Sequence, residues 1–338
     1  MDAAQRKPCY LVTAIGSLSA AAVIASLRDI PGCSIVGTNA SPAAWIHASC
    51  LVDAFHQVPP ASLREAFLAA LLRICREHTV THILPLTDPE VDVLSDLETV
   101  MAAEGVTLCI APPHAIKACR DKWLAYQQCV QAGDIPVIPT WLPMDAGTDA
   151  LPFPLIAKPR LGRSSEGLVR LDDARDLEHF RTKYQGQPYI IQPLLAGRVC
   201  VVDIVRQRST GKWAAASRVE LLRTSNGAGT TVQMMPAPHL CALAQRVAER
   251  LDTNGCINIE FLWPDASGKE KEPSGDSSLL MDINPRFSAG VGFSRMFGYD
   301  MVKNHLACFS SDAQTLEEFH PPLDSPIITR HYAATISR

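Results

Sequence analysis

The sequence lacks the patterns that would place it in several common classes of protein. Its eleven cysteines include no Cys-x-x-Cys pair, so neither a zinc site nor a disulfide framework is indicated, and a reducing cytoplasm fits best. There is no long basic stripe, and the formal net charge is -4, which argues against nucleic acid as a partner. No stretch is long and apolar enough to span a membrane.

The sequence also lacks two signatures of enzyme chemistry. The dinucleotide fingerprint places three glycines in the turn after the first strand, whereas the turn over residues 13–17 contains only Gly16. A nicotinamide-dependent oxidoreductase built on the first domain is therefore disfavoured. Nor is there a Ser–His or Cys–His pattern typical of covalent catalysis, so the expected chemistry uses no side-chain nucleophile.

What the chain does contain is an ordinary globular composition, with 338 residues, 47% hydrophobic and 20% charged, for which two or three domains are expected. The N-terminal third alternates strands and helices, which indicates an α/β fold with a doubly wound parallel sheet. Strands are expected at Cys9–Ala14, Ser34–Gly37, His82–Pro85 and Val106–Ile110, and helices at Ala20–Arg28, Leu63–Glu77 and Glu90–Glu104.

The first 27 residues admit a second interpretation as a signal peptide, because Arg6 and Lys7 precede a small apolar run. A strand, a turn at Gly16 and a helix explain the same residues, and the next strand follows directly. We favour the second interpretation because it completes a strand–helix–strand unit and agrees with the cysteine content.

Two acidic positions of this region lie at strand ends, where open sheets bind ligands. These are Asp53 and the Thr87-Asp88 pair. Helix capping by Asp88 is the alternative function. The prolines of Ala111-Pro112-Pro113 then mark a domain boundary.

The middle of the chain carries two lysines in suggestive positions. A helix over residues 115–132 contains Asp121 and Lys122, and Gly133 closes it. Ile135–Thr140 is expected to enter a strand. A further strand ends at Lys158-Pro159, and the loop after it, Gly162–Leu168, can lay N–H groups along phosphate oxygens as a lid. A simple hairpin turn is the alternative for that loop.

Beyond this loop, an apolar strand and a short linker over residues 189–197 suggest a hinge where an adenine ring could lie. Arg218, Glu220 and Arg223 then alternate along one strand. Such arginines are usually solvated, but facing a site they would grip phosphate or carboxylate. The charged segment between Pro264 and Ser278 is expected to be a loop without chemistry.

The most informative segments come last. Asn258-Ile259-Glu260-Phe261 and Asp282-Ile283-Asn284-Pro285-Arg286 both alternate apolar and polar residues, the period of half-buried strands. If these strands are neighbours, their polar faces form a cluster of hard oxygen ligands beside a guanidinium. Such a cluster can hold magnesium on a nucleotide triphosphate. A solvated strand face is the alternative for any single acidic residue.

In this order and spacing, these motifs resemble the ATP-grasp superfamily, in the branch of the carbamoyl-phosphate-synthetase large chain and the pyrrolysine-biosynthesis ligase. The resemblance runs from the Val12–Gly16 segment to Arg286. It implies an ATP-grasp fold with a Rossmann-like N-terminal domain over residues 1–112. The central lobe with the phosphate-covering loop would span 113–188, and the C-terminal lobe with the metal site 189–338.

The resemblance also implies a nucleotide site. The residues that would contact ATP are Lys122, Lys158, Gly162, Ser164, Ser165, Gly167, Gln192 and Leu194. Two positions of this nucleotide site depart from the family pattern. Gln192 stands where members often carry Glu, and Val199 stands where an acidic residue usually takes the ribose hydroxyls, so Asp203 is the candidate replacement.

For the metal, the resemblance implies Glu260, Asp282 and Asn284 as ligands of two Mg²⁺ ions, with Mn²⁺ as an alternative. Asp282 replaces the commoner Glu. Arg286, Lys158 and Asn284 would be catalytic. Substrate contacts are expected around three further residues, Arg218, Arg223 and Ser288.

The implied activity is ATP-dependent joining of a carboxylate to an amine through an acyl phosphate, on a small amino-acid-like metabolite. The alternatives are a kinase that stops at an acyl or carbamoyl phosphate and a non-catalytic ATP-binding module. The expected partners are small-molecule substrates and a second copy of the chain in a homodimer, with no nucleic acid and no membrane.

Overall fold

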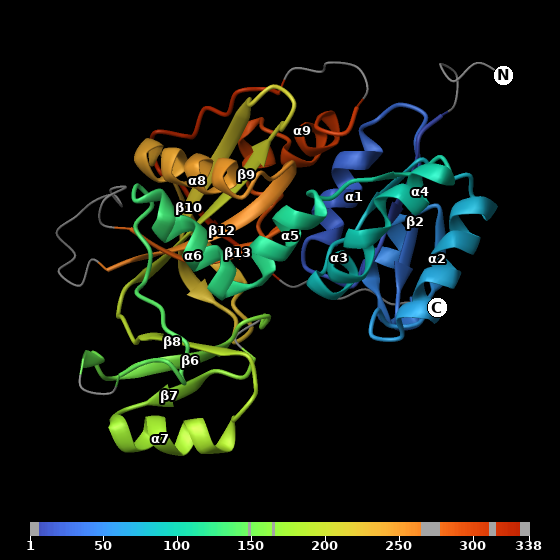
Figure 1. Ribbon diagram of the computed structural model, residues 1–338. Helices are drawn as coiled ribbons and strands as arrows, with labels where there is room; N and C mark the ends of the chain where they lie inside the picture. Colours follow the sequence, from blue (N-terminus) through green and yellow to red (C-terminus); the bar gives the residue numbers. More distant parts are fainter. Residues whose placement is uncertain (1–6, 148–149, 164–165, 265–277, 311–315, 332–338) are drawn as a thin grey trace.

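The computed structural model describes residues 7–147, 150–163, 166–264, 278–310 and 316–331. Within these ranges the strands form three sheets, of five, six and three strands. The fold is mixed α/β, with a parallel sheet at the N-terminal end, as the sequence predicted, and antiparallel sheets after it. Figure 1 shows the N-terminal sheet on one side and the two antiparallel sheets on the other.

The N-terminal sheet has the strand order β3-β2-β1-β4-β5, and its strands run parallel. Its strands are β1 (Cys9–Val12), β2 (Ser34–Asn39), β3 (Ala54–Gln57), β4 (His82–Leu84) and β5 (Thr107–Leu108). Its helices are α1 (Ala20–Arg28), α2 (Arg64–Glu77), α3 (Asp88–Leu94) and α4 (Glu98–Ala103). Short 3₁₀ turns lie at Ala43–Trp45, His47–Leu51 and Ser95–Leu97.

Both faces of this sheet are buried, which is the usual state of parallel sheets. On β1, Tyr10 and Val12 belong to the core that includes α1, whereas Cys9 and Leu11 belong to the core that includes α2. The strand alternation thus supplies two hydrophobic layers from one short segment.

Two helices expected to be continuous are broken, and the physical reason is clear for one of them. The helix predicted over residues 115–132 is two helices, α5 (Pro113–Arg120) and α6 (Lys122–Ala132). Between them Asp121 has extended backbone angles, and its carboxylate accepts hydrogen bonds from the backbone N–H groups of Trp123 and Leu124. Asp121 is therefore an N-cap rather than an interior residue. The predicted helix at Glu90–Glu104 likewise divides into α3, a 3₁₀ turn and α4.

The three-stranded sheet has the order β7-β6-β8 and is antiparallel. It consists of β6 (Leu155–Pro159), β7 (Val169–Leu171) and β8 (Tyr189–Pro193), with α7 (Ala174–Lys183) below it in Figure 1. The strand predicted at Ile135–Thr140 is absent; only an isolated bridge from Val137 to Leu280 occurs there. Pro136 and Pro139 lack the N–H groups that a ladder needs.

The six-stranded sheet has the order β13-β12-β9-β10-β11-β14. Its strands are β9 (Arg198–Arg206), β10 (Trp213–Arg223), β11 (Gly229–Met235), β12 (Gly255–Trp263), β13 (Leu279–Asn284) and β14 (Ile327–Thr329). Helix α8 (Pro238–Arg250) packs on one face of it. The other face packs partly against α1 and α9 (Met301–Ala307) and carries polar side chains elsewhere. A 3₁₀ turn at Ser294–Phe297 precedes α9.

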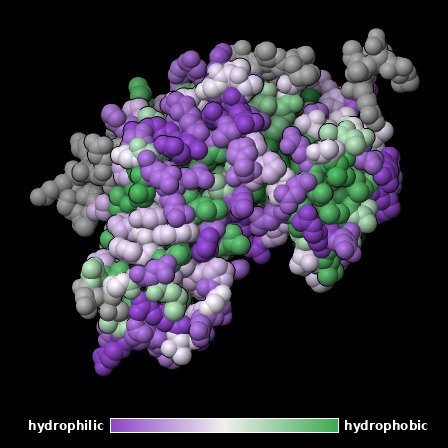
Figure 2. All heavy atoms as spheres, in the orientation of Figure 1, coloured by the Kyte–Doolittle hydropathy of each residue, from purple (hydrophilic) through white to green (hydrophobic). Residues whose placement is uncertain are grey.

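The surface is hollowed between the three-stranded lobe and the N-terminal domain on the face shown in Figure 2. Residues of all three sheets line the cavity found in the structure. Among the described residues, no helix has the length and apolar character needed to cross a membrane.

Candidate active site

The two strands with the alternating acidic pattern are neighbours. Strand β12 pairs with β13 in antiparallel register, so that Glu260 lies opposite Asp282 and Asn258 opposite Asn284. The Asn284 side-chain amide donates a hydrogen bond to Oδ1 of Asn258 at 3.1 Å. All four residues line one cavity. The structure therefore brings together the oxygen ligands that the two sequence segments predicted to be neighbours.

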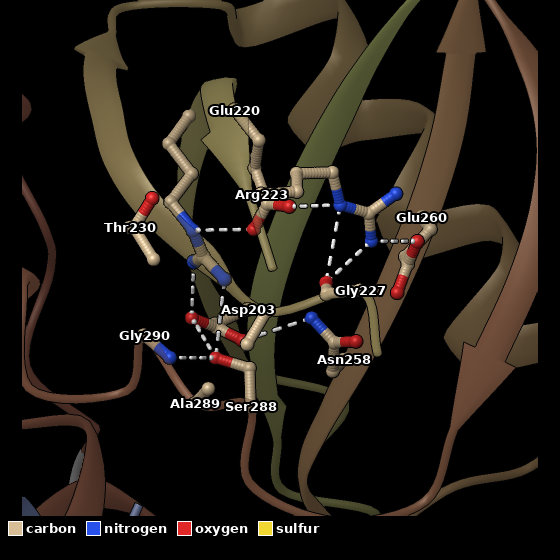
Figure 3. Close-up of polar contacts among 12 residues, drawn as sticks. Asp203, Glu220, Arg223, Gly227, Thr230, Asn258, Glu260, Ser288, Ala289 and Gly290 are labelled. Carbon is tan, nitrogen blue, oxygen red and sulfur yellow. Dashed lines mark hydrogen bonds and ion pairs between the residues drawn. The ribbon is translucent and has the colours of Figure 1, made fainter. Parts of the chain in front are cut away.

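Each acidic residue of this cluster already has a cationic partner. Lys122 Nζ lies 3.1 Å from Oδ1 of Asp282 and also donates to the carbonyl of Gly162 at 3.0 Å. Arg223 Nη2 lies 2.8 Å from Oε2 of Glu260 (Figure 3). The lysine expected to touch phosphate thus sits beside the predicted metal ligand and the start of the covering loop.

The ionisation of these groups reflects burial in a shared pocket. Burial raises the pKa of Glu260, Arg223 opposes that rise, and Asp282 adds to it. Burial lowers the pKa of Lys158, while the carboxylate of Asp282 partly restores it. In both cases burial penalises the charged form of the side chain, and an opposite charge nearby stabilises that form. Phosphate oxygens beside Lys158 would stabilise its ammonium form, and a divalent cation beside Glu260 would stabilise its carboxylate form.

Arg286 is fixed by a residue of the N-terminal domain. Its Nη2 lies 2.9 Å from Oδ2 of Asp88 and 3.3 Å from Oδ1 of Asn284. Arg120 Nη1 is 3.5 Å from the other oxygen of Asp88. These arginines lower the pKa of Asp88 against the opposing effect of its burial. The capping role considered for Asp88 is not observed, because its carboxylate faces Arg286 and α3 has no side-chain N-cap.

A buried ionic network lies next to Glu260, one of the predicted metal ligands (Figure 3). Arg218 pairs with Asp203 at 2.6 Å and lies 3.7 Å from Glu220. Glu220 also pairs with Arg223 at 2.7 Å, which connects the network to Glu260. Ser288 joins it by donating to Asp203 at 2.9 Å.

Asp203 was expected to reach the ribose, but it is placed elsewhere. It is only 2% exposed, its oxygens are taken by Arg218, Ser288 and Asn258, and it does not line the cavity. Gln192, expected at the adenine edge, is turned towards Thr140, to which it donates at 2.8 Å.

The cavity has a volume of about 870 Å³, which is large enough for a nucleotide or a drug-sized ligand. The structure brings most of the predicted residues to its wall: Lys122, Lys158, Gly162, Arg218, Arg223, Glu260, Asp282, Asn284, Arg286 and Ser288. The predicted residues that do not line it are Gly167, Gln192, Leu194 and Asp203. Ser164 and Ser165 lie outside the described residues. Asp53, considered as a ligand contact, is paired with Arg28 and does not line it either.

The cavity also extends to a crevice of the N-terminal sheet that sequence reasoning only partly foresaw. It opens at the ends of β1 and β4, which are adjacent although the chain runs from β1 outward to β2. Such a switch point is where open α/β sheets bind ligands. Ser17, Asn39, Thr87 and Glu90 line this part. Of these, only Thr87 belongs to a segment that the sequence indicated as a ligand contact; Ser17 lies in the turn over residues 13–17, which the sequence argued against only as a dinucleotide fingerprint.

Glu90 gives the crevice a titratable group near neutrality. Its Oε2 accepts hydrogen bonds from Thr13 at 2.6 Å and Thr87 at 3.1 Å, but burial is the largest effect and raises its pKa to about 7. An acid whose folded-state pKa is raised stabilises the fold below its unfolded pKa, and that contribution is lost as pH rises through the folded value.

We therefore expect Glu90→Gln to flatten the pH dependence of stability. Relative to the variant, the wild type should lose roughly 3 kcal/mol of unfolding free energy between about pH 4.5 and pH 7. Urea unfolding across this range measures the difference. Parallel curves for the two proteins would show that Glu90 is ionised at its ordinary pKa.

Comparison with known proteins agrees with this architecture. Residues 185–330 match a family model described as ATP-grasp in the biosynthetic pathway with Ter operon, and residues 11–109 match the PylC-like N-terminal domain. A search of curated proteins found no match to the chain.

Solved structures with a similar fold include three of different activities. The biotin carboxylase domain dimer of 2-oxoglutarate carboxylase from Hydrogenobacter thermophilus, in complex with MgADP, ADP and bicarbonate, is 13% identical, with a TM-score of 0.70 over 91% of this chain and 71% of that one. The L-amino acid ligase from Bacillus licheniformis is 14% identical, with a TM-score of 0.66 over 95% and 76%.

The third is pyruvate carboxylase from Rhizobium etli, which is 17% identical with a TM-score of 0.69 over 91% of this chain. The chain spans only 29% of that enzyme's length. At these identities the likeness shows a shared fold.

Proposed function

Because the chain has the ATP-grasp fold behind a PylC-like N-terminal domain, we propose that it is an ATP-dependent carboxylate–amine ligase. The observation that carries the proposal is the paired register of Glu260 with Asp282, beside Asn284 and Arg286, on the wall of one cavity. Carboxylate and amide oxygens are the ligands that Mg²⁺ prefers. Lys122 and Lys158 line the same wall and supply charges for phosphate.

The residues present fit magnesium and a nucleoside triphosphate. Glu260, Asp282 and Asn284 would hold the metal, and Mg²⁺ supplies charge neutralisation of the phosphates when bound. Two ions, or Mn²⁺ in their place, are part of the proposal. The nucleotide would enter with its phosphates towards Lys122 and Gly162, whose contact fixes the start of the loop after β6. Adenine contacts by Gln192 and Leu194 stay a prediction.

The chemistry proceeds in two displacements. The substrate carboxylate attacks the γ-phosphorus of ATP, the bond to the β–γ bridging oxygen breaks, and ADP leaves with that electron pair. The amine then attacks the acyl phosphate carbon, phosphate departs and the amine proton is lost to solvent or base. Arg286 is positioned by Asp88 to stabilise charge on the transferring group. Exclusion of water during this step would protect the acyl phosphate from hydrolysis.

For the substrates, we propose a small amino-acid-like metabolite in the crevice between β1 and β4. Seryl and threonyl hydroxyls, Asn39 and Glu90 line that part and can bind ammonium and hydroxyl groups. Arg218 is less suited to hold a substrate carboxylate, since Asp203, Ser288 and Glu220 already surround it. Arg223 and Ser288, which also line the cavity, remain proposed substrate contacts.

The test is release of ADP from ATP and magnesium with a panel of acids and amines. Release that requires both an acid and an amine, together with an amide product detected by mass spectrometry, supports the ligase. Release with acid alone would indicate an acyl-phosphate-forming kinase, and no release with any pair would favour a non-catalytic ATP-binding module.

Two subsidiary proposals accompany this function. All eleven cysteines are free thiols, which supports a reducing compartment such as the cytoplasm. A homodimer is the expected assembly; the related fold from Hydrogenobacter thermophilus is itself described as a dimer. Light scattering of the purified chain measures the assembly directly.

A further inference from the structure

Three side chains with metal-binding groups meet on the N-terminal domain, outside the cavity described above. His56 lies on β3, Glu77 is the last residue of α2, and His78 follows it. One ligand atom from each of the three lies within 4.8 Å of the other two. The Nε2 atoms of His56 and His78 are 2.7 Å apart, and Oε1 of Glu77 is 3.8 Å from Nε2 of His78.

The two imidazoles face each other through the same nitrogen atoms. Their ring centroids are 4.9 Å apart and their planes meet at 71°, so a single proton can bridge the pair and full protonation of both is disfavoured. A tetrahedral Zn²⁺ with Zn–N bonds of about 2.0–2.1 Å places two nitrogens roughly 3.3 Å apart. Small side-chain rotations would open the present spacing to that value.

The surroundings favour a cation bound by neutral imidazoles. Burial lowers the pKa of His56, and the neighbouring His78 and Arg73 lower it further while Glu77 opposes them. The site lies at the C-terminal end of α2, where the helix dipole is negative. Arg73 lies 3.1 Å from the other carboxylate oxygen of Glu77, whereas Oε1 of Glu77 is the oxygen close to His78.

We propose that His56, Glu77 and His78 form a binding site for a divalent transition metal of the zinc class. Two imidazole nitrogens and one carboxylate oxygen supply three ligands, and the partial exposure of all three side chains leaves room for water in the fourth position.

The position of the site gives it a structural consequence. In the described sheet β3 is an edge strand that pairs with β2 alone. The segment Val58–Ser62 begins two residues after His56 and lines the large cavity. A metal joining β3 to the end of α2 would therefore hold the entry of this segment in place.

The first experiment measures Zn²⁺ affinity of the full chain by competition with a chromophoric chelator. His56→Ala and His78→Ala should each weaken the site by at least ~100-fold, since loss of an outer partner alone costs 10–100-fold. His179→Ala is the matched control, because His179 is an exposed histidine on α7, and it should bind like the wild type. Equal affinity in His56→Ala and the wild type would overturn the site.

Two further measurements keep the test independent of folding defects and of the cysteines. Glu77→Gln changes an exposed carboxylate with little risk to the fold, and it should weaken binding by at least ~10-fold, because it removes the charge of one of the three ligands; unchanged affinity would overturn the three-ligand site. Co²⁺ bound to the wild type should show ligand-field bands without thiolate charge transfer, and thiolate bands would assign the metal to cysteine instead.

Hydrogen exchange tests the structural consequence. Zn²⁺ should slow exchange of backbone amides over residues 54–62 in the wild type and in His179→Ala, and have no effect there in His56→Ala. Equal exchange with and without metal in the wild type would overturn the role assigned to the site.

Discussion

Replacing Asp282 with asparagine is expected to lower ATP-dependent turnover by at least ~1,000-fold, which corresponds to about 4 kcal/mol of transition-state stabilisation. Asp282 lies opposite Glu260 in the strand pair and 3.1 Å from Lys122. The amide removes a negative ligand from the proposed metal and leaves the lysine without its counter-charge. Initial rates of ADP release at saturating magnesium measure the loss.

A matched control separates this effect from misfolding. Asp96→Asn makes the same chemical change at an exposed residue outside the cavity and should retain full activity. Both variants should unfold at urea midpoints close to that of the wild type. Undiminished ADP release by Asp282→Asn would exclude this carboxylate as a ligand of an essential metal.

Replacing Arg286 with alanine is expected to reduce kcat by ~100- to 1,000-fold, the range for removal of one preorganised donor to transition-state charge. Because its guanidinium is held at 2.9 Å by Asp88, it is fixed before the substrate arrives. The KM for ATP should change far less than kcat. Steady-state kinetics with ATP varied at saturating co-substrates measure both constants.

The control is Arg175→Ala, because the Arg175 side chain is 93% exposed. This variant should leave both kcat and KM unaltered. Arg286→Lys keeps the charge but loses the planar fork, so it should recover only part of the rate. A rise in KM with kcat preserved would assign Arg286 to ground-state binding rather than to the transition state.

The strand-level features were readable from the sequence because they depend on local periodicity. The alternation in Asn258–Phe261 and Asp282–Arg286 predicted which side chains share a face, and the observed register pairs those faces. The helix bounds of α1 agree with the prediction to the residue. Asp121 was misplaced inside a helix because its role depends on a change of backbone angles that a hydrophobic pattern does not report.

The long-range contacts could not be read in this way. Asp88 and Arg286 are separated by 198 positions, and nothing in either segment specifies the other. Asp203 is the candidate for the ribose because Val199 occupies the position where the resemblance implies an acidic residue. Its strand partners instead direct it to Arg218, with a hydrogen bond to Asn258 on the adjacent strand. Such pairings are decided by how the sheets pack, which depends on the whole chain.

The pairing of Lys122 with Asp282 and of Arg223 with Glu260 has a consequence for how ligands enter. Both carboxylates are paired with cations of the chain itself, so the proposed metal would have to displace the ammonium group of Lys122 and the guanidinium group of Arg223. Triphosphate oxygens offer these displaced groups new acceptors. Metal and nucleotide should therefore bind together as one complex. Their opposite charges then leave the net charge inside the cavity nearly constant.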